Sequence, residues 1–301
     1  MFDELPKGFV IRERYRILSV LGRGATSYVY LAKELRGGNL CAIKAISLDA
    51  DGSRDPFGHA DMVLQEARLL TGLSHPGLPK VFEFFSTSDV YFLVMEWVAG
   101  QTLYQIMLDR GVPITESETL SWGIEICHIL EYLHSRHPRP VVVGDIKPNN
   151  LLRTYEGRIK MIDFGIARYS GAGVKVAGLT FVTPGFSPPE QYGKGTIDHR
   201  TDIYSVGATL YFLMTGQPLE RYRFNVPPLR ALISSASAEL EATLAQCLQQ
   251  DRARRYQNVE DLARDLRAAQ EVEKRQTNMN AQARDILASL YRSKKRERLD
   301  L

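Results

Sequence analysis

The stretch Val141-Val-Val-Gly-Asp-Ile-Lys-Pro-Asn-Asn-Leu-Leu152 places three polar side chains between two apolar runs. They belong to Asp145, Lys147 and Asn150, which are an acid, a base and an amide. The valines before them and the leucines after them predict short buried strands on either side. We therefore expect a loop that the core holds rigidly, which is how proteins often mount catalytic side chains.

The composition is that of an ordinary globular protein, and it argues against one class of partner. With 301 residues, of which 44% are hydrophobic and 24% charged, the chain can form one large domain or two lobes around a substantial core. A net charge of +3 with both signs interleaved argues against nucleic acid, because phosphate-driven binding requires a dense basic face.

The cysteines and the hydropathy pattern favour a cytoplasmic setting. The three cysteines lie far apart, which indicates neither a disulfide framework nor a cysteine metal site, and fits a reducing compartment. Residues 1–10 lack the apolar run of a signal peptide, and no uncharged apolar stretch of about 18 residues occurs that would span a membrane.

Residues 15–48 alternate extended runs with glycine turns, which predicts an antiparallel meander. In the first turn, Gly22 and Gly24 would let backbone N–H groups approach a phosphate, because no Cβ intervenes. The alternative is a plain hairpin turn. A strand follows the turn rather than a helix, and the third glycine of a dinucleotide fingerprint is missing, which argues against a dinucleotide-binding fold.

One charged side chain lies in the third extended run. Lys44 is flanked by apolar residues, where an ammonium group is costly to bury unless it is paired or binds an anion. Alternatively, its stem lies on the sheet and its ammonium group reaches water. A helix is predicted over 60–73, with Glu66 on its apolar face, and further strands over 78–81 and 90–98.

From residue 103 onward the apolar spacing becomes mostly helical. A long buried helix is predicted over 117–133, and the histidines near its end, His134 and His137, are expected at a surface helix end rather than in a metal site. A short strand over 158–162 then leads into the triplet Asp163-Phe-Gly165.

These motifs together resemble the eukaryotic-type (Hanks-type) serine/threonine protein kinases, over about residues 15–270. The opening stretch is similar to the family's catalytic loop. Residues 42–44 are similar to its strand lysine motif, and residues 163–165 are similar to its metal-binding triplet. The resemblance implies an α+β bilobal fold, with a small antiparallel β lobe plus one helix (1–98), a larger mainly helical catalytic lobe (99–270), and a basic amphipathic helical tail (271–301).

The resemblance also implies roles for individual residues. Asp145 would orient the acceptor hydroxyl and take its proton, Lys147 would meet the phosphoryl charge, and Lys44 would pair with Glu66. Asn150 and Asp163 would bind Mg²⁺, for which Mn²⁺ could substitute. The residues implied in nucleotide binding are Leu21, Gly22, Gly24, Ser27, Val29, Ala42, Lys44, Met95, Glu96, Val98, Leu152 and Asp163.

The implied activity is transfer of the γ-phosphoryl group of ATP to Ser/Thr hydroxyls of proteins, the chain itself included. Lys147 and Thr183 are similar to the pattern of Ser/Thr rather than tyrosine kinases, and the compact form resembles bacterial members. The alternative is a pseudokinase scaffold that binds nucleotide without efficient transfer. A small-molecule phosphotransferase of related fold would normally lack the segment over 183–190.

Two residues of the catalytic loop depart from the family pattern. Gly144 stands where many relatives carry an arginine that binds a phosphate on the activation loop, so activity is expected to depend little on phosphorylation of Ser170, Thr180 or Thr183. Val143 replaces a histidine that packs on the phenylalanine of the metal-binding triplet, and a branched aliphatic side chain fills part of that role.

The tail repeats apolar residues every three or four positions and ends in a basic run. This pattern predicts an amphipathic helix, with Met279, Ala283 and Leu290 on one face. The helix would dock on the large lobe or form a solvated end, or it would contact a partner or an anionic membrane surface.

Overall fold

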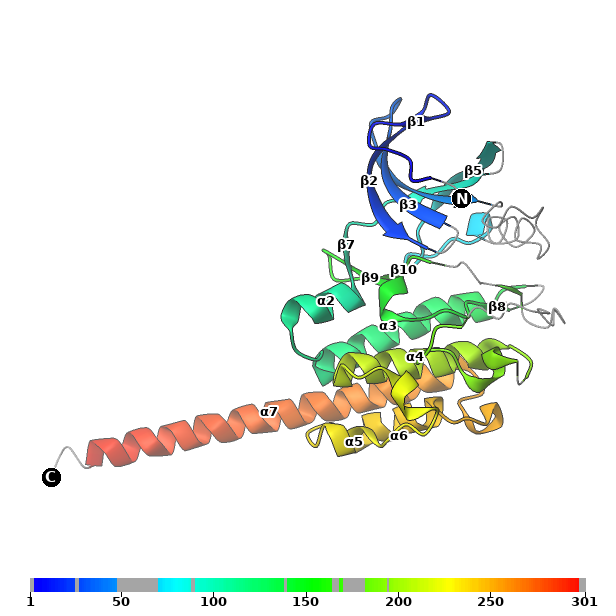
Figure 1. The fold of residues 1–301 in the computed structure, drawn as a ribbon. Coiled ribbons are helices and arrows are strands. Elements are labelled where there is room, and N and C mark those ends of the chain that lie inside the picture. Colours follow the sequence, from blue (N-terminus) through cyan, green and yellow to red (C-terminus); the bar gives the residue numbers. More distant parts are fainter. Residues whose placement is uncertain are drawn as a thin grey trace.

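The computed structural model describes residues 3–24, 27–47, 70–87, 90–137, 140–163, 168–169, 182–193 and 195–297. A curled sheet lies over a mainly helical body, and a long C-terminal helix runs along that body and beyond it (Figure 1). The predicted α+β bilobal fold is confirmed. The predicted helix over 60–73, which carries Glu66, falls almost entirely outside the described residues.

The small lobe is a six-stranded sheet in the order β1-β2-β3-β4-β6-β5, with every neighbouring pair antiparallel. The strands are β1 (Val10–Ile11), β2 (Tyr15–Arg23), β3 (Ser27–Glu34), β4 (Leu40–Ser47), β5 (Val81–Thr87) and β6 (Val90–Glu96). The predicted meander is confirmed in β2, β3 and β4. All residues of β4 from its second onward are buried, which explains why this strand is apolar on both faces.

The strand predicted over 78–81 is displaced toward the C-terminus. The N–H of Leu78 closes a turn on the carbonyl of His75, and Pro79 has no N–H with which to join a sheet. The strand β5 therefore begins at Val81, where the predicted strand ends.

The helical lobe is built around α4 (His199–Thr215), whose residues from Thr201 to Met214 are all buried. The other helices are α2 (Leu103–Arg110), α3 (Glu116–His134), α5 (Leu229–Leu232), α6 (Ala238–Cys247) and α7 (Val259–Glu297), with short 3₁₀ turns η1 (Pro148–Asn150), η2 (Pro189–Tyr192), η3 (Leu219–Tyr222) and η4 (Arg252–Arg254). The helix predicted over 117–133 is confirmed as α3, and the hydroxyl of Thr115 caps its first turn by accepting from the N–H of Glu118.

Short strands flank the polar loop that carries Asp145, Lys147 and Asn150. Strands β9 (Leu151–Thr154), β10 (Ile159–Met161) and β7 (Gly100–Thr102) form one sheet, and β8 (Val141–Val142) pairs with β11 (Arg168–Tyr169). The strands expected on both sides of the polar loop are thus present as β8 and β9. They fix the two ends of the segment 143–150 in the core.

The helix α7 continues without interruption from the lobe into the predicted tail (Figure 1). The side chains of residues 274–282 are all exposed, so this part does not dock on the large lobe. No helix in the described part of the chain combines the length and apolar character needed to cross a bilayer.

Candidate active site

The loop between β8 and β9 brings the three predicted polar side chains into contact. Lys147 Nζ lies 2.8 Å from Asp145 Oδ2, and the side-chain amide of Asn150 donates to the same oxygen at 3.0 Å. The amide also donates to the carbonyl of Asp145 at 2.9 Å. The side chains of Asp145 and Lys147 are each 23% exposed, which leaves both accessible to a substrate.

The hydroxyl of Thr183 completes this cluster from a distant segment. It donates to Asp145 Oδ1 at 2.7 Å and accepts from Lys147 Nζ at 3.0 Å. The backbone N–H of Thr183 donates to the hydroxyl of Ser187, which fixes the turn that presents Thr183. The sequence indicated Thr183 as a sign of substrate class and as a residue that could be phosphorylated, but not as a contact of Asp145. The signal for its contact is its place in the segment that ends at Glu190.

A buried carboxylate holds the backbone of the catalytic loop. Asp202 is fully buried on α4 and accepts hydrogen bonds from the N–H groups of Val143 at 3.0 Å and Gly144 at 2.8 Å. Gly144 has φ of +79°, a conformation that favours glycine because it has no Cβ. Asp202 thus fixes the backbone directly before Asp145.

The side chain of His134 is buried, contrary to its expected position at a surface helix end. Its side chain is 8% exposed, and Nε2 lies 2.9 Å from Asp202 Oδ2. The last turn of α3 packs against α4, and this contact covers the ring. The described residues contain no group of three or more His, Cys, Asp or Glu side chains suited to a metal.

The segment that carries Thr183 is anchored by a buried ion pair. The guanidinium of Arg255 donates to both carboxylate oxygens of Glu190, at 2.6 and 2.9 Å, and its side chain has no exposed surface. The guanidinium also lies over the ring of Tyr204, 5.0 Å from its centroid. Burial raises the pKa of the Tyr204 hydroxyl, and the nearby Arg255 opposes this shift.

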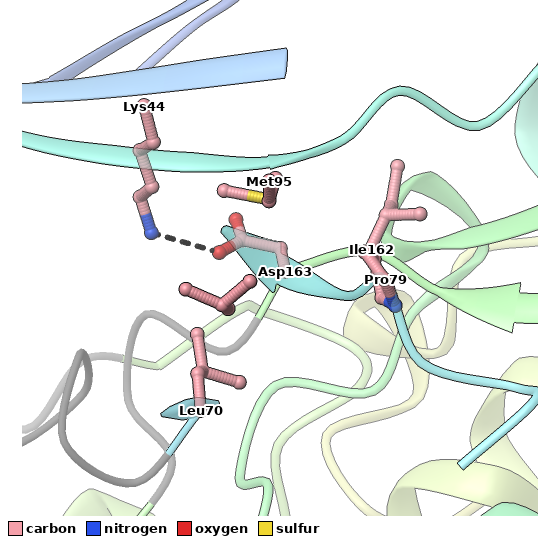
Figure 2. Close-up of a pocket in the computed structure, with 7 residues that line it drawn as sticks. Lys44, Leu70, Pro79, Met95, Ile162 and Asp163 are labelled. Atoms are coloured by element: carbon pink, nitrogen blue, oxygen red, sulfur yellow. Dashed lines mark hydrogen bonds and ion pairs between the residues drawn. The ribbon is translucent and has the colours of Figure 1, made fainter. Parts of the chain in front are cut away.

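Lys44 and Asp163 meet at the interface between the lobes. Figure 2 shows Lys44 extending from β4 toward Asp163, and Nζ lies 3.0 Å from Asp163 Oδ1. The side chain of Lys44 is 11% exposed and that of Asp163 is 44% exposed. The buried ammonium is therefore paired, which excludes the alternative that it simply reaches water. Glu66, its other expected partner, lies outside the described residues.

A pocket surrounds this ion pair. Besides Lys44, Asp163 and the predicted Met95, it is lined by four residues that the sequence did not indicate, namely Leu70, Pro79, Val81 and Ile162 (Figure 2). Met95 is 8% exposed, in keeping with a residue that limits the depth of a nucleotide pocket. Ile162 directly precedes Asp163, which is the one sequence signal that could have identified it.

The two glycines expected in one turn lie differently: Gly22 belongs to β2, where it pairs with Val29, and Gly24 lies in the turn that follows. The N–H of Gly24 donates to the carbonyl of Ser27 at 2.7 Å, and a Cβ at Gly24 would lie 2.7 Å from the Ser27 hydroxyl. A Cβ at Gly22 would meet none of the described residues within 4 Å. The described residues therefore leave the backbone at Gly22 accessible, as the implied approach of a phosphate requires. Leu21 is 49% exposed.

The other residues implied in nucleotide binding lie on neighbouring strands. Val29 pairs with Lys44 and Ala42 pairs with Met95, so these four positions lie on three adjacent strands. Leu152 is on β9 and 8% exposed, and Val98 follows the end of β6.

Glu96, the last residue of β6, is engaged in the fold by its backbone and its side chain. Its N–H donates to the carbonyl of Lys80 at 2.8 Å, so this group is used within the small lobe. Its carboxylate accepts from Lys160 Nζ at 2.7 Å. The N–H of Glu96 is therefore already engaged and does not offer a free donor to a nucleotide.

Asn150 and Asp163 offer a donor set that fits Mg²⁺. Asn150 uses its amide nitrogen for both hydrogen bonds to Asp145, and its side-chain oxygen accepts none from the described residues. Asp163 supplies a partly exposed carboxylate. Two hard oxygen ligands suit Mg²⁺, which is usually bound by one or two protein groups together with substrate phosphates and water.

A curled antiparallel sheet over a helical lobe, with a Lys–Asp pair at the junction and an Asp–Lys–Asn–Thr cluster below it, defines a protein kinase. In agreement, the chain matches the protein kinase domain family over residues 15–301. The chain therefore belongs to the protein kinase family, and its relatives place it among the bacterial Hanks-type serine/threonine kinases.

The relatives are bacterial and longer than this chain. The chain is 32% identical over 273 residues to a probable serine/threonine-protein kinase of Streptomyces coelicolor, and 30% identical over 274 residues to the serine/threonine-protein kinase PknB of Mycobacterium tuberculosis. These alignments cover 85% of this chain but 40% and 43% of the relatives. The chain thus spans less than half the length of these relatives.

A solved structure shares the fold. The PknI kinase domain of Mycobacterium tuberculosis is 24% identical, with a TM-score of 0.72 over 88% of this chain and 100% of that domain.

Proposed function

We propose that the chain is an active ATP-dependent protein serine/threonine kinase, which transfers the γ-phosphoryl group of ATP to Ser/Thr hydroxyls of proteins, itself included. The observation that carries this proposal is the hydrogen-bonded cluster of Asp145, Lys147, Asn150 and Thr183. It holds an acid, a cation and an amide in fixed positions below the Lys44–Asp163 pair.

Each side chain then has a separate task. Asp145 accepts hydrogen bonds on both carboxylate oxygens, so its charge and orientation are set for accepting the proton of a substrate hydroxyl. Lys147 is a compact cation beside that position and balances charge on the phosphoryl group. Mg²⁺ bound by Asn150 and Asp163 would neutralise the phosphate charge. Lys44 would orient the phosphates from above.

The pseudokinase alternative lacks its usual sign. A pseudokinase normally loses the strand lysine, the catalytic aspartate or the metal-binding aspartate, whereas this chain has Lys44, Asp145 and Asp163. The two aspartates and the lysine also make contacts suited to their expected roles. These contacts support the enzyme over the scaffold.

Transfer of label from γ-labelled ATP to a generic basic protein tests the proposal. Wild type with Mg²⁺ is expected to label the protein and itself, and the Asp145→Ala variant is expected to label neither above background. Label from neither protein, with nucleotide binding intact, would favour the scaffold. Equal labelling by both would show that Asp145 is not the catalytic base.

Phosphatase treatment is expected to leave transfer to an added substrate within about twofold of the untreated rate. The reason is that Gly144 has no side chain to bind a phosphate, while its backbone N–H is already held by Asp202. Initial rates before and after treatment, with the phosphatase removed, measure the effect. Loss of activity that returns after preincubation with ATP would contradict this expectation.

The setting and the partners are also proposals. Protein substrates follow from the proposed activity, and nothing in the charge distribution favours nucleic acid. Burial raises the pKa of the Cys41 thiol to about 11 and that of Cys127 well above its usual value, which keeps these thiols protonated. Such thiols fit the reducing cytoplasm. A contact of residues 271–301 with a partner or an anionic membrane stays a prediction.

A further inference from the structure

Gln191 is a fully buried polar side chain whose amide is only half satisfied. Its nitrogen donates to the carbonyl of Gly144 at 2.8 Å, but its oxygen is buried and has no hydrogen-bond donor among the described residues. Burying a polar oxygen without a partner costs stability, and an apolar side chain of the same size would avoid this cost. The hydrogen bond that the amide nitrogen donates is therefore the one property of Gln191 that an apolar residue would lack.

That donor acts on the residue directly before the expected catalytic base. The N–H of Gly144 is held by Asp202 from α4, and its carbonyl is held by Gln191 from η2. Both polar groups of Gly144 are thus fixed by buried side chains from different elements. Glycine has the largest conformational freedom of any residue, and here it adopts φ of +79°, so an external restraint matters more at this position than elsewhere.

The geometry of the peptide bond carries this restraint to Asp145. The carbonyl of Gly144 and the Cα of Asp145 lie in the same rigid plane. Fixing the direction of the Gly144 carbonyl therefore fixes the position of the Asp145 Cα, from which the Asp145 side chain extends. Gln191 lies 47 residues away in sequence but acts within one peptide unit of the carboxylate.

We propose that Gln191 is a positioning residue for phosphoryl transfer, whose buried amide orients the Gly144–Asp145 peptide and thereby the Asp145 carboxylate. The inference rests on the proposed kinase activity. It also links two regions, because η2 directly follows the segment that presents Thr183 to Asp145. A displacement of that segment would release the hydroxyl contact and the peptide contact together, so the loop would lose its orientation whenever the segment moves.

The Gln191→Met variant tests this role, because methionine fills a similar volume and has no donor. We expect kcat to fall about 10- to 100-fold, since small displacements of a catalytic group have effects of this size. The KM for ATP is expected to stay within about twofold, because the nucleotide contacts lie on other elements. Gln191→Asn keeps an amide but is one methylene shorter and does not reach the carbonyl, so it is expected to show the same loss.

Thr201→Val is the matched control. Thr201 is equally buried, and its hydroxyl donates to Glu190 at 3.2 Å without contacting the catalytic loop in the described residues. This variant is expected to lower the melting temperature while keeping kcat near that of wild type. If Gln191→Met and Gln191→Asn also keep kcat within about twofold at a temperature where they are folded, Gln191 only fills space and the inference is wrong.

Amide hydrogen exchange over residues 141–146 decides the inference without activity. The N–H of Asp145 lies in the peptide unit that Gln191 holds, so Gln191→Met is expected to exchange it several-fold faster than wild type, and Thr201→Val is expected not to. Unchanged exchange in Gln191→Met would overturn the proposed restraint. If wild type transferred no phosphoryl group, the proposed function would fail, and this measurement would still test the contact itself.

Discussion

The Asp145→Asn variant is expected to bind ATP as wild type does but to transfer phosphoryl groups about 10²- to 10⁴-fold more slowly. A positioned proton acceptor usually accelerates a reaction by this factor. Asparagine has the same shape as aspartate but is a far weaker base. Its oxygen can accept from Lys147 and Asn150 in place of Oδ2, while its NH₂ group faces the hydroxyl of Thr183. The loop is therefore expected to keep its conformation.

Steady-state kcat and a separate ATP binding constant measure this effect. Asp109→Asn is a suitable control, because Asp109 is exposed on α2 and its carboxylate accepts a hydrogen bond only from the side chain of Gln101 among the described residues. It is expected to behave as wild type. A similar loss of kcat in both variants would point to a general effect of the substitution, and an unchanged kcat in Asp145→Asn would remove Asp145 from the role of base.

The Arg255→Met variant is expected to lower the free energy of unfolding by about 3–5 kcal/mol, because it leaves the carboxylate of Glu190 buried without its charge partner. The guanidinium also donates to three backbone carbonyls, those of Gln249, Arg200 and Gln250. All of these acceptors would lose a donor. Urea unfolding midpoints, followed by fluorescence and by circular dichroism, measure the loss.

Two further variants separate the causes of that loss. The double variant Glu190→Gln with Arg255→Met removes both charges, so it is expected to be more stable than Arg255→Met alone. It is still expected to be less stable than wild type, because the three backbone carbonyls remain without the guanidinium donor. Arg264→Met removes an exposed arginine that pairs with Asp261, and it is expected to leave the unfolding midpoint nearly unchanged because solvent screens exposed ion pairs. Equal losses in Arg255→Met and Arg264→Met would contradict the importance of burial.

The local patterns of the sequence were sufficient to predict the main elements. The meander, the long helix α3 and the polar loop with its flanking strands all follow from apolar spacing and turn residues. Asp145, Lys147 and Asn150 lie within five residues of one another, so the loop that the sequence predicted also keeps them close in space. Such predictions succeed because the interacting groups belong to one short segment.

Contacts between distant segments could not be predicted in the same way. The hydroxyl of Thr183 meets Asp145 across 38 residues, Gln191 meets Gly144 across 47, and His134 meets Asp202 across 68. Each of these contacts depends on how helices and strands pack against one another, and local patterns in a single sequence do not predict that packing. A histidine or glutamine at a helix end has an exposed and a buried interpretation, and only the packing of α4 against the loop decides between them.

The uninterrupted helix α7 has a geometric consequence for anything that binds its far end. Residues 274–297 add about 36 Å of rod at 1.5 Å per residue, and each residue turns the rod by about 100°. A stiff rod transmits direction as well as distance. The face that bears Met279 thus has a fixed orientation relative to the catalytic lobe. A single residue inserted upstream of Met279 would rotate that face about the helix axis without altering the lobe itself.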